Sequence, residues 1–313
     1  MQNGIVVKAW TFDELYGGNG PFLNALEQRG QVFVCEIPSS FYGWVRKPET
    51  TAGESAKPEK RGGKGTQSAK KKKKKKRVKS GHPVLQVRNL AKYSRVFQKQ
   101  SWQKYRIKDT QKGPEVWEVK WAEFWRKDEN GLPGRRQTLI VARNVLTGEI
   151  KYFLSNRVPG EKLSDGSYVS LRWLLSVAFG RWSVEAVFRE AKEELGLDHY
   201  EVRGWRCVHR HFYVTQLSQL FCARIRQAFD QQTTEEESRG RLTVEQVRSA
   251  MNVWLQHCQL PPKPRLAAFQ QELDRQQYHQ HRNEQARQSH TKTRHRRLKA
   301  LGIEPDTIKS CIP

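Results

Sequence analysis

Apolar and polar positions near the start of the chain predict two strands separated by a helix. Residues 4–10, GIVVKAW, form a short apolar run rich in β-branched residues, which is typical of a buried strand. A glycine-rich turn follows, and Pro21 is placed to open a helix that ends near Gly30. Residues 31–37, QVFVCEI, predict a second strand. This order of elements forms an α/β unit, in which we expect the two strands to pair in parallel.

Residues 115–155 have a β-rich pattern. Tryptophan and valine alternate with polar residues in EVWEVKWAEFW, and RRQTLIVARNV is placed to pair with EIKYFLSN across a turn at Thr147-Gly148. The pattern predicts a small sheet inserted between the first α/β unit and the helices that follow.

The pattern from Ser170 onward is mostly helical. One helix is predicted over residues 170–195 and another over residues 204–229. A third begins after Thr243, which is a candidate N-cap with Gln246 at the capping-box position.

Charge changes this picture more than composition does. The 313 residues suffice for one large domain or two ordinary ones, and their formal net charge is +25. This imbalance indicates a polyanionic partner, with nucleic acid ahead of a membrane surface. No apolar stretch is long enough to span a membrane, and the first residues do not resemble a signal peptide. The odd number of cysteines, five, indicates reduced thiols in an intracellular protein.

Two segments hold much of the positive charge. Residues 46–80 contain 15 Lys or Arg against three Glu, with an unbroken lysine run over residues 70–76. Such a segment cannot form a core, so we predict that it is disordered. It is either an arm that binds the DNA backbone or a solvated insertion without a specific role. Residues 280–300 contain seven Lys or Arg and one acidic residue, and they predict a basic tail helix or arm.

Residues 181–192, RWSVEAVFREAK, contain the candidate chemistry. On one continuous helix, Arg181, Glu185 and Lys192 share a narrow stripe, and Arg189 lies on its flank. An adjacent apolar face is suited to core packing. Composition alone also fits an ordinary amphipathic helix with an Arg181–Glu185 pair, which contributes only ~0.3 kcal/mol.

The spacing R-x3-E-x6-K resembles the Y-R-E-K signature of insertion-sequence transposases with an RNase H-like catalytic domain. Ala178 occupies the tyrosine position, with Phe179 beside it. Residues 194–211, ELGLDHYEVRGWRCVHRH, resemble the family segment that follows the signature. Residues 13–38 resemble the segment around the family's second aspartate, and residues 276–290 are similar to its basic tail. The matching segments occur in the family's order.

The resemblance implies an α/β fold, consisting of an incomplete RNase H-like core, a β-rich insertion and a helical C-terminal part. It implies that Asp13 and Glu185 are the second and third catalytic carboxylates and ligands of Mg²⁺ or Mn²⁺. It also implies a set of residues that bind DNA, namely Arg181, Arg189, Lys192, Arg203 and Arg210. The expected partners are double-stranded DNA at transposon ends and a second copy in a synaptic homodimer, with no membrane partner and a cytoplasmic, nucleoid-associated location.

The expected organisation has five parts. They are a partial RNase H-like core with the second-Asp strand (1–45), a disordered Lys-rich insertion (46–82), a β-rich insertion and return strand (83–160), the catalytic-Glu helix with the following helix (161–230), and a helical C-terminal region with a basic tail (231–313).

The family's first aspartate has no counterpart, because residues 1–12 contain neither Asp nor Glu. A wrong start or a decayed gene explains such a truncated copy. We therefore expect weak metal binding, an unpaired sheet edge and little or no catalysis by this chain alone. One alternative is a non-catalytic basic DNA-binding protein. Another is an RNA- or ribosome-associated protein, although no segment resembles an RNA-binding module.

Overall fold

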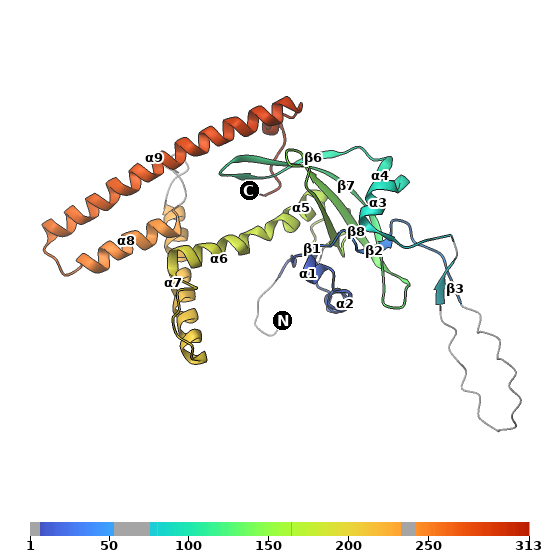
Figure 1. Ribbon diagram of the computed structural model, residues 1–313, viewed down its shortest axis with the longest axis horizontal. Helices are drawn as coiled ribbons and strands as arrows, with labels where there is room; N and C mark the ends of the chain where they lie inside the picture. The colour runs from blue at the N-terminus through green and yellow to red at the C-terminus, as the bar shows by residue number, and fades with distance from the viewer. Residues whose placement is uncertain (1–6, 53–75, 80, 164, 233–241, 313) are drawn as a thin grey trace, which may run out of the picture. The chain divides into compact units, whose positions relative to one another are not determined.

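A computed structural model describes residues 7–52, 76–79, 81–163, 165–232 and 242–312 (Figure 1). The chain divides into two compact units after Arg181. The sheet unit comprises residues 1–181 and 293–313, and the helical unit comprises residues 182–292. The fold is mixed α/β, with a largely antiparallel sheet in one unit and helices in the other.

The predicted helix and second strand are present at the start of the sheet unit, whereas the described part of the predicted first strand forms only a single bridge at Trp10. Trp10 bridges Phe33 in parallel, which confirms the predicted direction of pairing, although residues 4–6 of the first strand lie outside the described range. Helix α1 (Glu14–Gly17) and helix α2 (Gly20–Gln28) follow, and β1 (Val34–Glu36) is the second strand. Pro21 opens α2 as predicted.

The β-rich segment forms the centre of the sheet. Strand β7 (Gly113–Lys127) pairs antiparallel with β8 (Pro133–Asn144), and β8 pairs antiparallel with β9 (Ile150–Ser155). The predicted hairpin between β8 and β9 is confirmed, and Gly148 turns it with a φ of +75° that favours glycine.

This sheet is not a separate insertion, contrary to the sequence-based expectation. Strand β1 pairs antiparallel with β9, with Cys35 opposite Leu154, so the first α/β unit and the β-rich segment share one seven-stranded sheet. The sheet order is β1-β9-β8-β7-β2-β5, with β6 (Gln103–Thr110) paired to β7 as well. Strands β2 (Tyr42–Trp44) and β5 (Leu85–Gln86) complete it.

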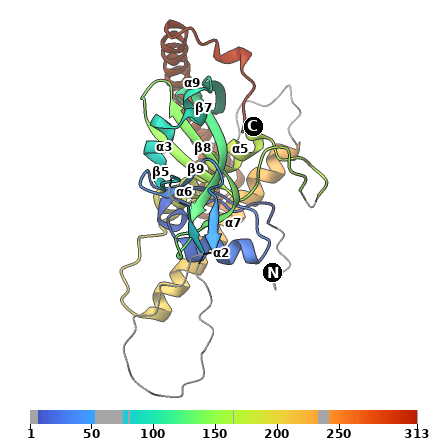
Figure 2. The same cartoon turned by 90° about the vertical axis from the view of Figure 1, so that its right-hand side faces the viewer.

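Helices cover both faces of the sheet because side chains alternate between the faces along each strand (Figures 1 and 2). On one face, fully buried Phe124 lies in a core with residues of α2, α3 (Val87–Tyr93) and α4 (Arg95–Gln98). On the other face, fully buried Ile140 packs in a second core with residues of α5 (Leu171–Gly180).

The C-terminal residues complete the sheet unit. Leu298 and Ile303 are buried against Val116, and the backbone N–H of Cys311 donates to the carbonyl of Arg106 at 2.8 Å. The last residues therefore pack beside β6.

Part of the segment predicted to be disordered is ordered. Strands β3 (Thr50–Ala52) and β4 (Lys76–Val78) pair antiparallel, and the Lys79 ammonium donates to the Glu49 carboxylate at 2.5 Å. Paired β-branched residues and this ion pair give these flanks a structure that charge counting misses. Residues 53–75, which include most of the lysine run, lie outside the described residues.

The prediction of one helix over residues 170–195 is wrong. Helix α5 ends at Gly180, and α6 (Trp182–Leu195) begins after Arg181. Glycine lowers helix propensity at this point, and the two halves pack in different units.

The helical unit contains α6, α7 (Trp205–Gln232), α8 (Val244–His257) and most of α9 (Pro262–Ala300). The Thr243 hydroxyl accepts from the Gln246 N–H, and the Gln246 side chain accepts from the Thr243 N–H, so the predicted capping box is confirmed. A small cluster around buried Cys222 and Val247 joins α6, α7 and α8.

Candidate nucleic-acid-binding surfaces

Asp13 lies at the carboxyl end of the extended segment that runs beside β1. The Phe12 carbonyl accepts from the Glu36 N–H at 3.0 Å, and Asp13 follows directly. One Asp13 carboxylate oxygen accepts from the Leu15 N–H at 3.1 Å and caps α1. Asp13 thus has a structural role as an N-cap. The end of a strand is also where a rigidly held metal-binding carboxylate is expected.

The expected stripe is retained within α6. Helical spacing places Glu185, Arg189 and Lys192 within an arc of about 60°, and buried Ala191 lies about 120° round from Glu185. Arg189 and Lys192 are exposed, whereas Glu185 is partly buried. Arg181 precedes α6, so its place in the stripe no longer follows from one continuous helix.

Arg203 is exposed in the loop before α7, and Arg210 is exposed near the start of α7. The imidazole of His211 contacts the Gly196 carbonyl at 2.8 Å and anchors this loop to α7. This contact gives His211 a structural role. Arg203 and Arg210 remain directed to solvent, where a phosphate backbone can reach them.

Metal coordination stays a prediction. Asp13 belongs to the sheet unit and Glu185 to the helical unit. Among the described residues, no three or more His, Cys, Asp or Glu side chains converge. Metal binding by Asp13 and Glu185 therefore rests on the sequence resemblance alone.

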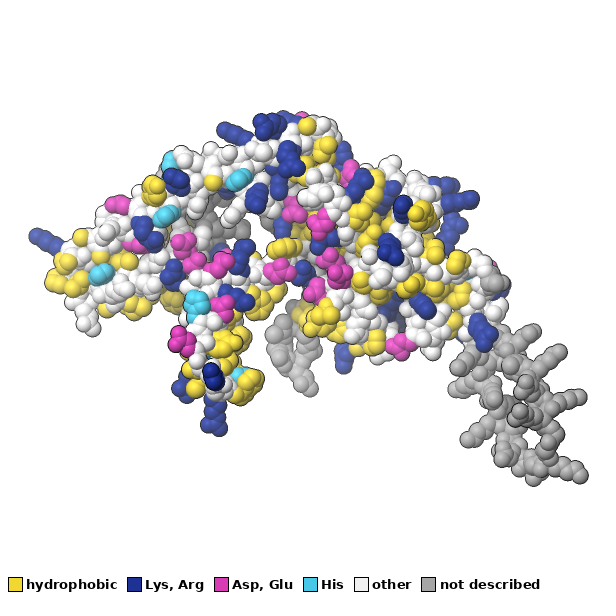
Figure 3. Space-filling model, in the orientation of Figure 1, with side chains coloured by type: hydrophobic (Ala, Val, Ile, Leu, Met, Phe, Trp, Pro, Cys, Tyr) yellow, Lys and Arg dark blue, Asp and Glu magenta, His cyan; other side chains and the backbone are white. Residues whose placement is uncertain are grey.

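A basic strip on α3 and α4 was not identified from the sequence. Arg88, Lys92, Arg95 and Lys99 recur at spacings of three or four residues, and all four are exposed. The buried residues of these helices, such as Phe97, face the sheet. Figure 3 shows Lys and Arg side chains gathered over this part of the molecule.

The sequence around this strip lacks acidic residues altogether. Residues 60–108 contain no Asp or Glu, so the strip has no local counter-charges. The absence of acidic residues over so long a segment is the feature by which the strip could have been found in the sequence. The structure was needed to show that all four cations are exposed.

A cavity of about 680 Å³ lies close to the strip, where β7 passes from its pairing with β6 to its pairing with β2. The Gln100 side-chain amide donates to the Trp121 carbonyl at 2.8 Å and occupies part of this edge. Lys120 lines the cavity and donates to the Phe97 carbonyl at 2.8 Å. Exposed Arg46 lines it too.

Two cationic side chains contact the indole ring of Trp102 beside this cavity. The Lys120 ammonium lies 4.7 Å from the centre of the Trp102 ring, and the Arg143 guanidinium carbon lies 4.6 Å from it. Burial and the positive charge of Arg143 lower the pKa of Lys120. An anion close to this wall would offset that repulsion.

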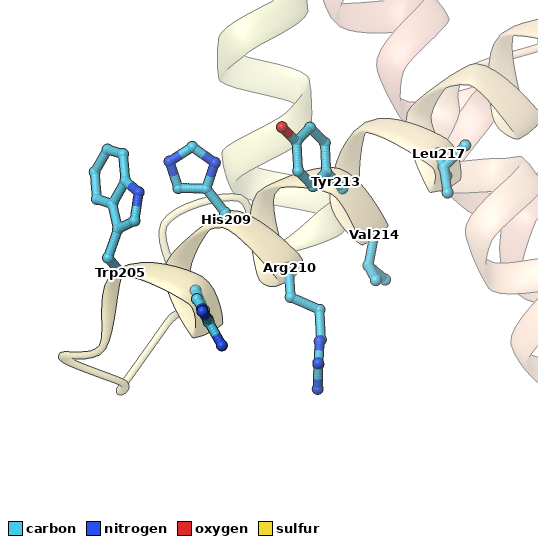
Figure 4. Close-up of a pocket in the computed structure, with 7 residues that line it drawn as sticks. Trp205, His209, Arg210, Tyr213, Val214 and Leu217 are labelled. Atoms are coloured by element: carbon cyan, nitrogen blue, oxygen red, sulfur yellow. The ribbon is translucent and has the colours of Figure 1, made fainter.

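A row of rings along α7 is a third feature. Trp205 and His209 have ring centres 4.0 Å apart, and His209 and Tyr213 have ring centres 5.9 Å apart. Figure 4 shows these three rings in sequence along the helix, with Arg210 and Leu217 lining the same groove of about 550 Å³. Ring-bearing residues at every fourth position were the sequence signal for this row.

No known protein family model matches the chain, and no curated protein matches it either. In the described part of the chain, no helix combines the length and apolar character needed to cross a membrane.

Proposed function

We propose that the chain is a DNA-binding protein of the insertion-sequence transposase type, with a partial RNase H-like core in its sheet unit. The ordered sequence segments around Asp13, Glu185 and residues 194–211 carry this proposal. The position of Asp13 directly after a segment that pairs in parallel with β1 supports it. The Mg²⁺ or Mn²⁺ requirement and a synaptic homodimer belong to the same proposal.

DNA binding is the part of the proposal with the most physical support. Phosphate contacts by Lys and Arg give nucleic-acid binding its affinity and its dependence on salt. The strip of Arg88, Lys92, Arg95 and Lys99 offers four exposed cations on two adjacent helices and their ends. We infer that this strip contacts the DNA backbone. Arg189 and Lys192 on α6 are candidate phosphate contacts of the helical unit.

We infer that these 313 residues bind DNA without cutting it on their own. Residues 1–12 contain no carboxylate side chain ahead of Asp13. Two carboxylates hold a pair of divalent cations less well than three, because a bridging ligand is lacking.

A salt titration of duplex binding tests the DNA proposal. The double variant Lys92→Glu/Arg95→Glu should bind roughly tenfold more weakly, and its log-affinity slope against log salt should fall by about 2. Arg29→Glu/Lys112→Glu is the matched control, because it makes the same charge change at two other exposed positions of the sheet unit. Equal losses in both variants would show that net charge, and not the strip, governs binding.

Competition and nicking assays separate the alternatives. Structured RNA that displaces duplex DNA at equal concentration would favour the RNA-associated protein. Nicking of supercoiled plasmid with Mg²⁺ that disappears in Glu185→Ala would show that the chain is catalytically active. Salt-dependent DNA binding without nicking is the expected result.

A further inference from the structure

Apolar and aromatic side chains recur at every fourth position along α7, in a row that winds about 200° round the helix. The exposed fractions of its five apolar members run from 40% for Ile225 to 75% for Trp205, and His209 is partly buried. The row consists of Trp205, His209, Tyr213, Leu217, Phe221 and Ile225. Residues four apart form a continuous ridge along a helix surface, and such ridges are the elements that pack into the grooves of another helix.

The middle of this ridge lies opposite the side of α7 that packs within the helical unit. Thr215 and Cys222 are 4% exposed, and Cys222 lies in the cluster shared with α8. Leu217 lies two residues after Thr215, about 200° round the helix, and is 65% exposed. A contiguous apolar surface of this kind is typical of an interaction site, in contrast to scattered exposed apolar residues.

Charge determines which partner suits the ridge. Helix α7 contains four arginines, at positions 206, 210, 224 and 226, and a single acidic residue, Asp230. Arg206 and Arg224 are both exposed and lie about five turns apart on the same line of the helix, and this line crosses the ridge between Tyr213 and Leu217. A partner with carboxylates at both ends of its apolar face would pair with them.

We propose that the α7 ridge binds an amphipathic helix of another protein, with an apolar face flanked by Asp or Glu. Packing of two four-residue ridges would cross the helices at about 50°. A second copy of α7 suits the ridge poorly, because its arginines would face those of the first copy. A DNA backbone suits it poorly as well, because phosphates do not cover exposed Leu217, Phe221 and Ile225.

Binding of two synthetic peptides to the full chain tests the proposal by fluorescence anisotropy. One helical peptide carries Leu at every fourth position with Glu at both ends, and its twin carries Lys in place of Glu. The acidic peptide should bind, and the Lys twin should bind at least roughly tenfold more weakly. Leu217→Asp should weaken the acidic peptide by a similar factor.

Leu266→Asp is the matched control, because Leu266 is 66% exposed on α9 and Leu217 is 65% exposed on α7. The control should bind the acidic peptide like the unmodified chain. Equal binding of both peptides, or an unchanged affinity in Leu217→Asp, would overturn the proposal. A dimer that Leu217→Asp dissociates would assign the ridge to a second copy. A lower melting temperature in Leu217→Asp than in Leu266→Asp would show that the chain itself covers the ridge.

Discussion

The two units differ in how charge and apolar surface are distributed. The helical unit, residues 182–292, contains 16 Lys or Arg and 14 Asp or Glu, so nearly all of the net charge of +25 belongs to the sheet unit. The sheet unit is therefore the better candidate for contact with a polyanion. The helical unit is almost balanced, and its most distinctive surface is apolar.

Packing separates the units in the same way. The sheet unit buries large side chains such as Trp117, Phe124 and Leu154 almost completely on the two faces of one sheet. Within the described residues of the helical unit, the buried side chains are few and small, among them Ala191 and Cys222. The comparison indicates that the sheet unit is stabilised by its own core, whereas the described part of the helical unit buries few large side chains.

The largest expected effect tests whether the units are independent. Phe124→Ala removes a fully buried ring from the sheet core and should cost about 3–5 kcal/mol. Hydrogen exchange resolved by peptide should show lost protection in β7, β8 and β9, with α7 and α8 unchanged. An equal loss of protection in α7 and α8 would show that the two units unfold together.

The second prediction concerns a buried ion pair of the sheet unit. Arg126 is 4% exposed, lies 3.3 Å from the Glu27 carboxylate and donates to the Gly20 carbonyl. Arg126→Met leaves the Glu27 carboxylate buried without its cation and should cost about 3 kcal/mol in urea unfolding. Arg126→Met/Glu27→Gln should recover much of this loss. A double variant no more stable than Arg126→Met would assign the loss to packing.

Local signals made part of this fold predictable from the sequence. Pro21, the Thr147-Gly148 turn and the Thr243 capping box each act over a few residues, and each was placed correctly. The pairing of β1 with β9 joins Cys35 to Leu154, 119 residues apart, and no local pattern specifies it. The helix break at Arg181 follows from packing in two different units, which periodicity does not report.

The candidate site also has features that local sequence predicts and features that it does not. The shared side of Glu185, Arg189 and Lys192 follows from helical spacing once α6 is formed. The basic strip on α3 and α4 was hidden in the sequence, because charge counts do not show which side of a helix faces the sheet. Whether Asp13 meets Glu185 depends on long-range packing and stays a prediction.

A smaller effect should appear in the helical unit alone. Thr243→Ala removes the N-cap of α8 and should destabilise this helix by about 1 kcal/mol. Faster hydrogen exchange in α8, with β8 unchanged, is the expected result. Ser218→Ala is the control, because Ser218 is an exposed residue inside α7 that caps no helix. Equal changes in both variants would remove the capping explanation.

The smallest expected effect is a dependence of the helical unit on acid. A hydrogen bond from Arg275 holds the pKa of Glu272 below its ordinary value of 4.5. A lowered folded-state pKa stabilises the fold above the unfolded value, and that stability is lost as the pH falls toward the folded value. The gain is small because the Arg275 side chain is 48% exposed and solvent screens the pair. Melting at about pH 7 and at about pH 3 should therefore differ less in Glu272→Gln than in the unmodified chain. Asp274→Asn is the control and should keep the full difference, because the Asp274 carboxylate on α9 accepts a hydrogen bond from the neutral Gln270 side chain. If Glu272→Gln kept the full difference in melting between the two pH values, the acid sensitivity would come from other groups and not from the Glu272–Arg275 pair.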